Sequence, residues 1–137
     1  MIHFPQASKG GGSCAGFPDV CKVPAPPAPP IPTPFPNTSQ VRNSDKTIDR
    51  VLVKNKDIVV EDSEPSSSNG DEAGSLKGMM KAPKQMNETG FMKGSSKVYA
   101  KGKKVVPHLT PSKHNGANLP GGGVHCAPSQ TDVITSP

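Results

Sequence analysis

Hydrophobic residues gather in short β-branched runs that are separated by polar loops along this chain. Residues 48–61 read IDRVLVKNKDIVVE, two such runs around a polar turn at 54–57. Residues 95–107 read SSKVYAKGKKVVP, two further runs around a turn at 101–103. Both patterns predict β-hairpins, and residues 132–135 predict a short closing strand. Because no segment keeps a 3.6-residue apolar period, we predict a mainly β fold of short hairpins and long loops.

A proline-rich segment interrupts this pattern at residues 17–37, which read FPDVCKVPAPPAPPIPTPFPN. Proline fixes φ at about −65° and removes a backbone donor, so neither a helix nor a central strand should run through this segment. We therefore predict an extended, stiff polyproline-type segment. Residues 1–16 are polar and Gly-rich, and we expect them to form an irregular lead-in.

Composition predicts a small apolar core. The 137 residues include 17 prolines and 14 glycines, and the formal net charge is only +5. A fold of this composition needs a metal, a partner or a rigid proline frame in addition to its core. No apolar run is long enough for a transmembrane helix, and the N-terminus lacks the features of a secretory signal. We expect a single domain over residues 1–137.

Three histidines and a cysteine lie close together near the C-terminal end: His108, His114, His125 and Cys126. Imidazole and thiolate are good zinc ligands, and a tetrahedral zinc site needs four of them. The alternative is that the histidines are exposed in loops and Cys126 is a small buried apolar residue. Cys14 and Cys21 could supply a replacement ligand or be buried thiols. Three cysteines are an odd number and do not suggest a disulfide framework.

Other candidate chemistry is weaker. The acids of residues 70–74 lack a companion histidine, so we interpret them as a solvated turn. No residue is marked as a nucleophile, and we expect no enzymatic activity. The lysines between residues 77 and 104 are interpreted as solvated hairpin lysines rather than a nucleic-acid site. Two rival functions stay open: a Pro-rich adaptor that presents P-x-x-P segments, and a small zinc-dependent nucleic-acid binder.

Four blocks of the sequence resemble the PAAR-like proteins that cap the spike of type VI secretion systems and related contractile injection machines. They are Phe17–Asn37, Asn69–Gly74 (NGDEAG), Gly94–Asn115 (GSSKVYAKGKKVVPHLTPSKHN) and Cys126–Pro137 (CAPSQTDVITSP). Their order along the chain is that of the family. The Pro-Ala-Ala-Arg motif itself is absent, so the resemblance is to the PAAR-like branch.

The resemblance implies a small β-cone whose broad base sits on a trimeric VgrG-type spike. It implies a structural zinc near the apex, held by His108, His114, His125 and Cys126. The implied function is a structural tip that sharpens the spike and helps it to penetrate a target envelope. We expect no effector extension, no nucleic-acid partner and no stable membrane insertion, although effectors or the target-cell envelope are possible partners. The implied location is the bacterial cytoplasm before firing, followed by outward delivery.

The proline segment is our candidate for the surface that contacts the spike. We expect it at or close to the base, because an ordered segment loses little entropy on binding. The alternative is that its large apolar side chains pack on the cone's own sheet. The candidate contact residues are Pro24, Pro27, Pro30, Ile31 and Phe35.

Overall fold

The computed structural model is mainly β, as predicted, and describes residues 3–76, 86–115 and 119–137. A five-stranded antiparallel sheet has the order β3-β2-β12-β11-β8, and four two-stranded ribbons accompany it. The strands are β1 (Phe4–Pro5), β2 (Ser13–Ala25), β3 (Ala28–Gln40), β4 (Ser44–Asp45), β5 (Ile48–Val53), β6 (Lys56–Ile58), β7 (Glu64–Pro65), β8 (Thr89–Phe91), β9 (Tyr99–Ala100), β10 (Lys103–Lys104), β11 (Pro111–His114), β12 (Leu119–Ala127) and β13 (Ile134–Thr135). One 3₁₀ turn, η1 (Val41–Asn43), follows β3.

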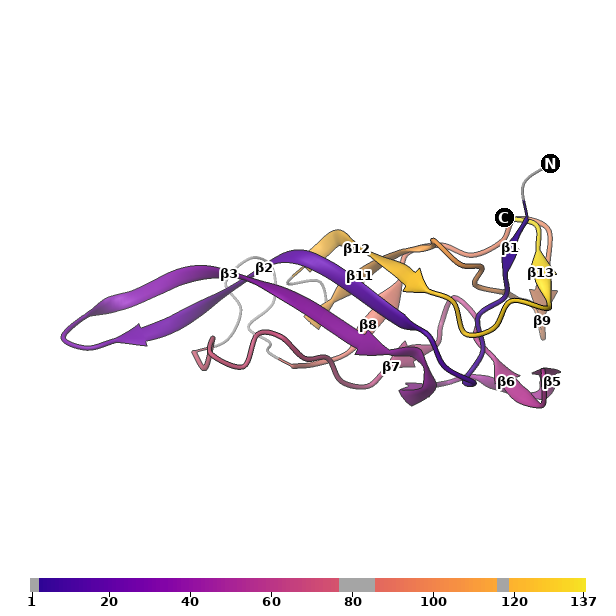
Figure 1. The fold of residues 1–137 in the computed structure, drawn as a ribbon, viewed down its shortest axis with the longest axis horizontal. Coiled ribbons are helices and arrows are strands. Elements are labelled where there is room, and N and C mark those ends of the chain that lie inside the picture. The colour runs from indigo at the N-terminus through magenta and orange to yellow at the C-terminus, as the bar shows by residue number, and fades with distance from the viewer. Residues whose placement is uncertain (1–2, 77–85, 116–118) are drawn as a thin grey trace.

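The molecule tapers along its long axis (Figure 1). The β2–β3 hairpin forms the narrow end and projects beyond the other strands. The broad end carries the ribbons β1/β13, β5/β6 and β9/β10, together with both chain termini. Among the described residues, no helix has the length and apolar character needed to cross a membrane.

Both predicted hairpins and the predicted closing strand are confirmed. Lys54 and Asn55 join β5 to β6 with φ of 52° and 64°, and Lys101 and Gly102 join β9 to β10 with φ of 50° and 78°. Two central residues with positive φ match the right-handed twist of a tight hairpin. At the C-terminal end, β13 pairs with β1 rather than extending a larger sheet. The N-terminal residues are therefore part of the fold and not an irregular lead-in throughout.

The prediction of a single polyproline-type run over residues 17–37 is wrong. The segment turns back at Pro26 and Pro27, and its two arms pair as β2 and β3. The exclusion of a central strand holds for β3, which is an edge of the five-stranded sheet, but β2 lies between β3 and β12. The pairing of β2 with β12 ends at Gly16, before the first proline of the segment. The sequence argument overlooked that proline is tolerated on an edge strand where its missing N–H faces away from the partner.

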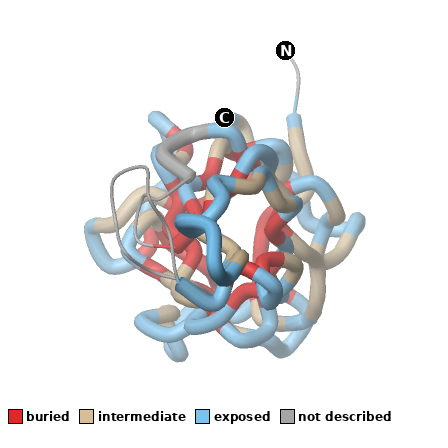
Figure 2. The backbone as a smooth tube through the Cα atoms, turned by 90° about the vertical axis from the view of Figure 1, so that its left-hand side faces the viewer, coloured by how far each residue is buried: buried red, intermediate tan, exposed pale blue. Residues whose placement is uncertain are grey.

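The interior is more polar than apolar. One apolar cluster contains Val59, Val106 and Phe91, and a second contains Val60 and Val105. Around them lie many buried polar side chains, including those of Gln6, Asp19, Asn37, Asp71, Thr89, Ser112, His114, Asn115 and His125. Figure 2 shows the buried backbone gathered around the long axis. A chain poor in apolar residues thus depends on interior hydrogen bonds, because a buried polar group without one is costly.

Candidate functional site: two buried polar clusters

The first cluster is centred on Asn115, at the root of the β2–β3 hairpin. Its side-chain nitrogen donates to Oδ2 of Asp19, at 2.5 Å, and to Oδ2 of Asp71, at 2.7 Å. Its Oδ1 accepts from the hydroxyl of Ser68, at 3.1 Å, and from the backbone N–H of Asn87, at 2.8 Å. Asn115 therefore ties β2 to the segments around residues 68–71 and 87.

His114 extends this cluster toward β3 and β8. Its Nδ1 lies 2.5 Å from Oδ1 of Asn37, and its Nε2 lies 3.1 Å from the hydroxyl of Ser112. An N–H at Nδ1 that donates to Asn37 and an Nε2 that accepts from Ser112 satisfy both contacts with a neutral ring. Asn37 in turn donates to Asp19 at 3.3 Å. Burial is the main cause that lowers the pKa of His114 to about 4, so the ring is neutral at pH 7.

Three groups of this cluster have the chemistry of metal ligands. The ligating atoms of Asp19, Cys21 and Asp71 all lie within 4.8 Å of one another, and all three side chains are buried. Burial, followed by the two nearby carboxylates, raises the pKa of the Cys21 thiol to about 12. A metal here would have to displace that proton and compete with Asn115 for the carboxylate oxygens.

The sequence argument misjudged Asp71. We expected the acids of residues 70–74 in a solvated turn, and only Glu72 is exposed; Asp71 is fully buried. Nothing in the local composition distinguishes the two acids. The available signal was the NGDEAG block itself, since a family motif that places an acid beside Gly70 and Gly74 indicates close packing. Gly74 lies so near Cys21 that an added Cβ would overlap the cysteine side chain.

The second cluster contains His108, whose backbone N–H donates to the carbonyl of Pro5, and His125 of β12. Their rings meet edge to face, with 5.4 Å between centroids, and Phe91 packs edge-on against His125. Among the described residues, neither nitrogen of His125 nor Nδ1 of His108 has a well-formed hydrogen bond. Burial first, and then His108, lower the pKa of His125 to about 4, while the carbonyls of Pro107 and Ala127 act in the opposite direction.

The structure does not bring the four predicted zinc ligands together. His108 and His125 are neighbours, and their unpartnered ring nitrogens suit a metal. Cys126 is exposed, with its Sγ 3.6 Å from the carbonyl oxygen of Ser13. His114 belongs to the first cluster, where Asn37 and Ser112 already use both ring nitrogens. The predicted ligand set therefore fits zinc in two of its four members, and zinc itself stays a prediction.

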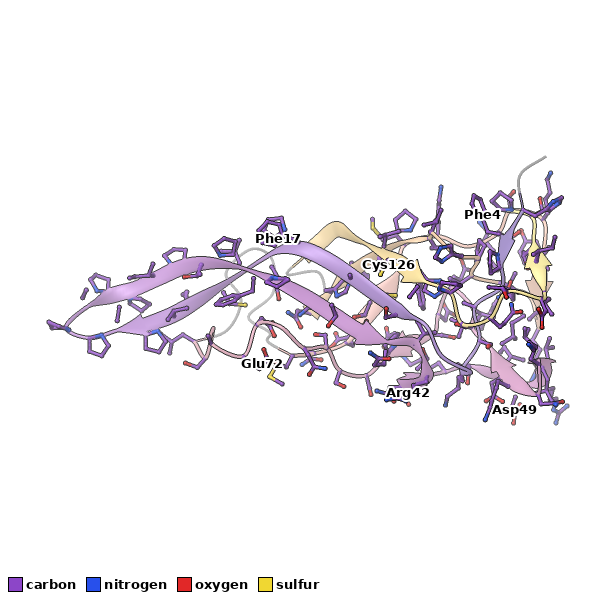
Figure 3. The ribbon with its side chains drawn as sticks, in the orientation of Figure 1. Phe4, Phe17, Arg42, Asp49, Glu72 and Cys126 are labelled. Carbon is purple, nitrogen blue, oxygen red and sulfur yellow. The ribbon has the colours of Figure 1, made fainter. Side chains whose placement is uncertain are left out.

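The candidate contact residues of the proline segment lie on the hairpin at the narrow end, and not at the broad end where we expected the base. Pro24, Pro27, Pro30 and Ile31 are exposed or partly exposed there, and Phe35 is half-buried beside Gly74. In Figure 3, Phe17 lies where this hairpin begins to project beyond the other strands, whereas Phe4 and Asp49 lie at the broad end.

Exposed apolar side chains are also found on the ribbons of the broad end. Leu52 on β5 is 54% exposed, Tyr99 on β9 is 53% exposed, and Ile134 on β13 is 58% exposed. Each belongs to a different one of the three ribbons. Sequence reasoning missed these residues, because an isolated apolar residue in a short hairpin is expected to face the core.

Comparisons with known proteins place these features in a family. No solved structure matches the chain. The chain is 36% identical to the DNase toxin Tse7 of Pseudomonas aeruginosa over an alignment of 122 residues, and the match covers 81% of this chain. The match covers only 30% of that protein, so the chain spans less than a third of its relative.

This relative contradicts the expected absence of enzymatic activity and counts against the expected absence of a nucleic-acid partner. We expected no enzymatic role and no nucleic-acid partner, and a protein that shares most of this chain's length is a DNase toxin. The sequence argument failed because it treated the family as structural and searched only this chain for a catalytic residue. The family model of the toxin PAAR-like domain matches residues 12–121. This range includes the first polar cluster and His108 of the second, but not His125. The chain therefore belongs to the toxin PAAR-like domain family.

Proposed function

We propose that this chain is the spike-associated part of a type VI secretion effector and that it docks through its broad end on a trimeric VgrG-type spike. The family match supports an association with the type VI spike. The observation that carries the docking surface is the set of exposed apolar residues on three separate ribbons at the broad end. The narrow β2–β3 hairpin then leads, and the broad end contacts the spike.

Three ribbons suit a three-fold partner. They are built from different parts of the chain, β1 with β13, β5 with β6 and β9 with β10, and they lie at one end of the molecule. Each presents an apolar side chain that is more than half exposed: Leu52, Tyr99 or Ile134. Exposed apolar side chains that face one partner can supply the apolar part of a protein interface, and aromatic anchors such as Tyr99 often dominate its energy.

This orientation replaces the one expected from the sequence. A projecting hairpin at the narrow end cannot contribute to a contact surface at the broad end. In this proposal the residues from Pro24 to Phe35 therefore belong to the leading hairpin and not to the docking surface. The structure also weakens the rival role as a Pro-rich adaptor. Partner domains of that class bind a free polyproline helix, whereas the prolines here are held in a paired hairpin.

A pull-down with the purified trimeric spike protein tests the docking surface. The triple variant Leu52→Asp, Tyr99→Asp and Ile134→Asp should lose spike binding while keeping the β circular dichroism and the cooperative melt of the parent. The matched control carries Asp at Ile31 and Phe35 on the hairpin, and it should bind as the parent does. If the hairpin variant loses binding and the broad-end variant keeps it, the orientation is reversed.

The role of the chain in delivery of a toxin is the second part of the proposal. Tse7 is a DNase toxin, and we infer that this chain delivers or belongs to a protein that acts on DNA in the target cell. It would be held in the bacterial cytoplasm before firing and then be carried outward. Incubation of purified protein with plasmid DNA, with and without a divalent cation, tests whether this chain itself cleaves DNA. Intact plasmid under both conditions would restrict the chain to the delivery role.

Structural zinc is the third part. His108 and His125 would hold it, and bound zinc would stabilise a fold that has a small apolar core. The support is that, within the described part of the chain, Nδ1 of His108 and both ring nitrogens of His125 are buried and make no well-formed hydrogen bond.

A further inference from the structure

Every second residue of β3 from Pro30 to Pro36 is a proline. Pro32 lies opposite Lys22 of β2, and Pro34 lies opposite Val20. In an antiparallel pair, opposite residues either exchange both backbone hydrogen bonds or exchange none. Since proline has no N–H, Pro32 and Pro34 must occupy the second kind of position, where the backbone groups face away from the partner strand.

Two contacts outside the hairpin agree with this direction. The carbonyl oxygen of Lys22, opposite Pro32, accepts from the N–H of Leu76 at 3.2 Å, so it faces away from β3. Thr38, two positions beyond Pro36, exchanges two backbone hydrogen bonds with Asn69, at 2.8 and 2.7 Å. The outer edge of β3 thus pairs with another segment at Thr38, and the prolines begin at the next outward-facing position.

The outer edge of β3 between residues 30 and 36 therefore presents carbonyl groups and no N–H donors. A strand that approached this edge would find no partner for its own carbonyls, which pairing would then remove from water. The carbonyl of Pro36 is already covered, because Gly70 lies against it so closely that an added Cβ would overlap its oxygen.

The hairpin lacks the usual protection of an exposed edge. Charged side chains commonly prevent strand edges from pairing with one another, and residues 23–36 contain no charged residue. Ile31 is exposed on the same arm, and Figure 3 shows mostly carbon in the side chains along the projecting part. An uncharged, exposed strand of this kind is an aggregation hazard unless its backbone is blocked.

We propose that the alternating prolines close the outer edge of β3 to strand addition, so that the leading hairpin neither pairs with a second copy of this chain nor accepts a partner's β-strand. The prolines take the place of edge charges, so the leading hairpin can stay uncharged without pairing with a second copy. This inference concerns the backbone of the hairpin and does not depend on which end of the molecule docks on the spike.

The test introduces two outward-facing backbone N–H donors in the variant Pro32→Thr, Pro34→Thr. Threonine is chosen because it suits a strand and keeps the edge uncharged. Analytical ultracentrifugation over a range of concentrations should show a single species for the parent. The double variant should self-associate at concentrations at least about tenfold lower than any at which the parent does. A tenfold change corresponds to about 1.4 kcal/mol in the free energy of association. Pro128→Thr, at an exposed position outside the strands, is the matched control and should behave as the parent.

Hydrogen exchange identifies the surface that associates. In the associated double variant, the new amides at positions 32 and 34 should exchange slowly, because they are paired across the edge. A double variant that melts cooperatively and stays monomeric overturns the proposal, and so does association with freely exchanging amides at both positions. If the double variant fails to fold, Pro34→Thr alone is read by the same criteria.

Discussion

Removal of the Asn115 side chain tests whether buried hydrogen bonds hold this core-poor fold together. Asn115 has a positive φ of 52°, so Asn115→Gly deletes the side chain without adding backbone strain. The substitution removes two hydrogen bonds to the carboxylates of Asp19 and Asp71 and leaves these groups buried. It also removes the acceptor of Ser68 and of the Asn87 N–H.

The magnitude follows from the number and type of these bonds. A hydrogen bond to a charged group contributes about 1.5–3 kcal/mol, and a neutral one contributes about 1 kcal/mol. Because neighbouring bonds in one network are not additive, we expect a loss of about 4 kcal/mol in the free energy of unfolding. For a domain of this size the melting temperature should fall by roughly 10–15 °C.

Urea unfolding followed by far-UV circular dichroism measures the effect, with Asn55→Gly as the matched control. Asn55 also has a positive φ, of 64°, and it is exposed in the β5–β6 turn. The control should therefore change stability by no more than about 0.5 kcal/mol. Equal unfolding midpoints for Asn115→Gly and Asn55→Gly would refute the argument that the buried cluster stabilises the hairpin root.

Three further predictions follow from the two clusters. Burial lowers the pKa of His114 to about 4 from an ordinary value of 6.5, so the unfolded chain binds the extra proton first and stability should fall as the pH drops from about 6.5 to 4. The urea midpoint of His114→Gln should depend less on pH over this window than that of the parent, and an equal pH dependence would contradict the lowered pKa of His114. Gly123→Ala would place a Cβ 2.5 Å from the Ser112 hydroxyl and 2.6 Å from Nε2 of His114, and it should cost about 2–3 kcal/mol of stability in a thermal melt. Gly90→Ala is the matched control: the atoms nearest to its added Cβ belong to the flexible Lys113 side chain, so it should cost less than about 1 kcal/mol. Elemental analysis of protein purified without added metal should find zinc, and a chelator should lower the melting temperature of the parent but not that of His125→Ala; protein without metal whose melt is indifferent to the chelator would remove zinc from the proposal.

Local chemistry accounts for the parts of the fold that the sequence predicted. The turns at residues 54–55 and 101–102 are short, polar and flanked by β-branched residues, and a two-residue turn of this kind favours a hairpin in nearly any context. The closing strand was recognisable for the same reason. The family resemblance rested on whole blocks, and these blocks contain Asp19, Asp71 and Asn115 of the first cluster and His108 of the second, but not His125.

Non-local packing decided the rest. Nothing in the proline segment itself shows that it turns back at Pro26, because an extended chain and an edge strand tolerate the same prolines. Spacing along the chain grouped His114 with His108 and His125, but the pairing of β11 with β8 and β12 places its ring beside Asn37 of β3 instead. Likewise, Asp71 and Glu72 are adjacent acids, and only the approach of Asn115 from a distant segment distinguishes the buried carboxylate from the solvated one. Local sequence thus determined where the chain turns and which residues could bond, whereas long-range strand register determined which of them meet, since register depends on the pairing of segments that are far apart in the sequence.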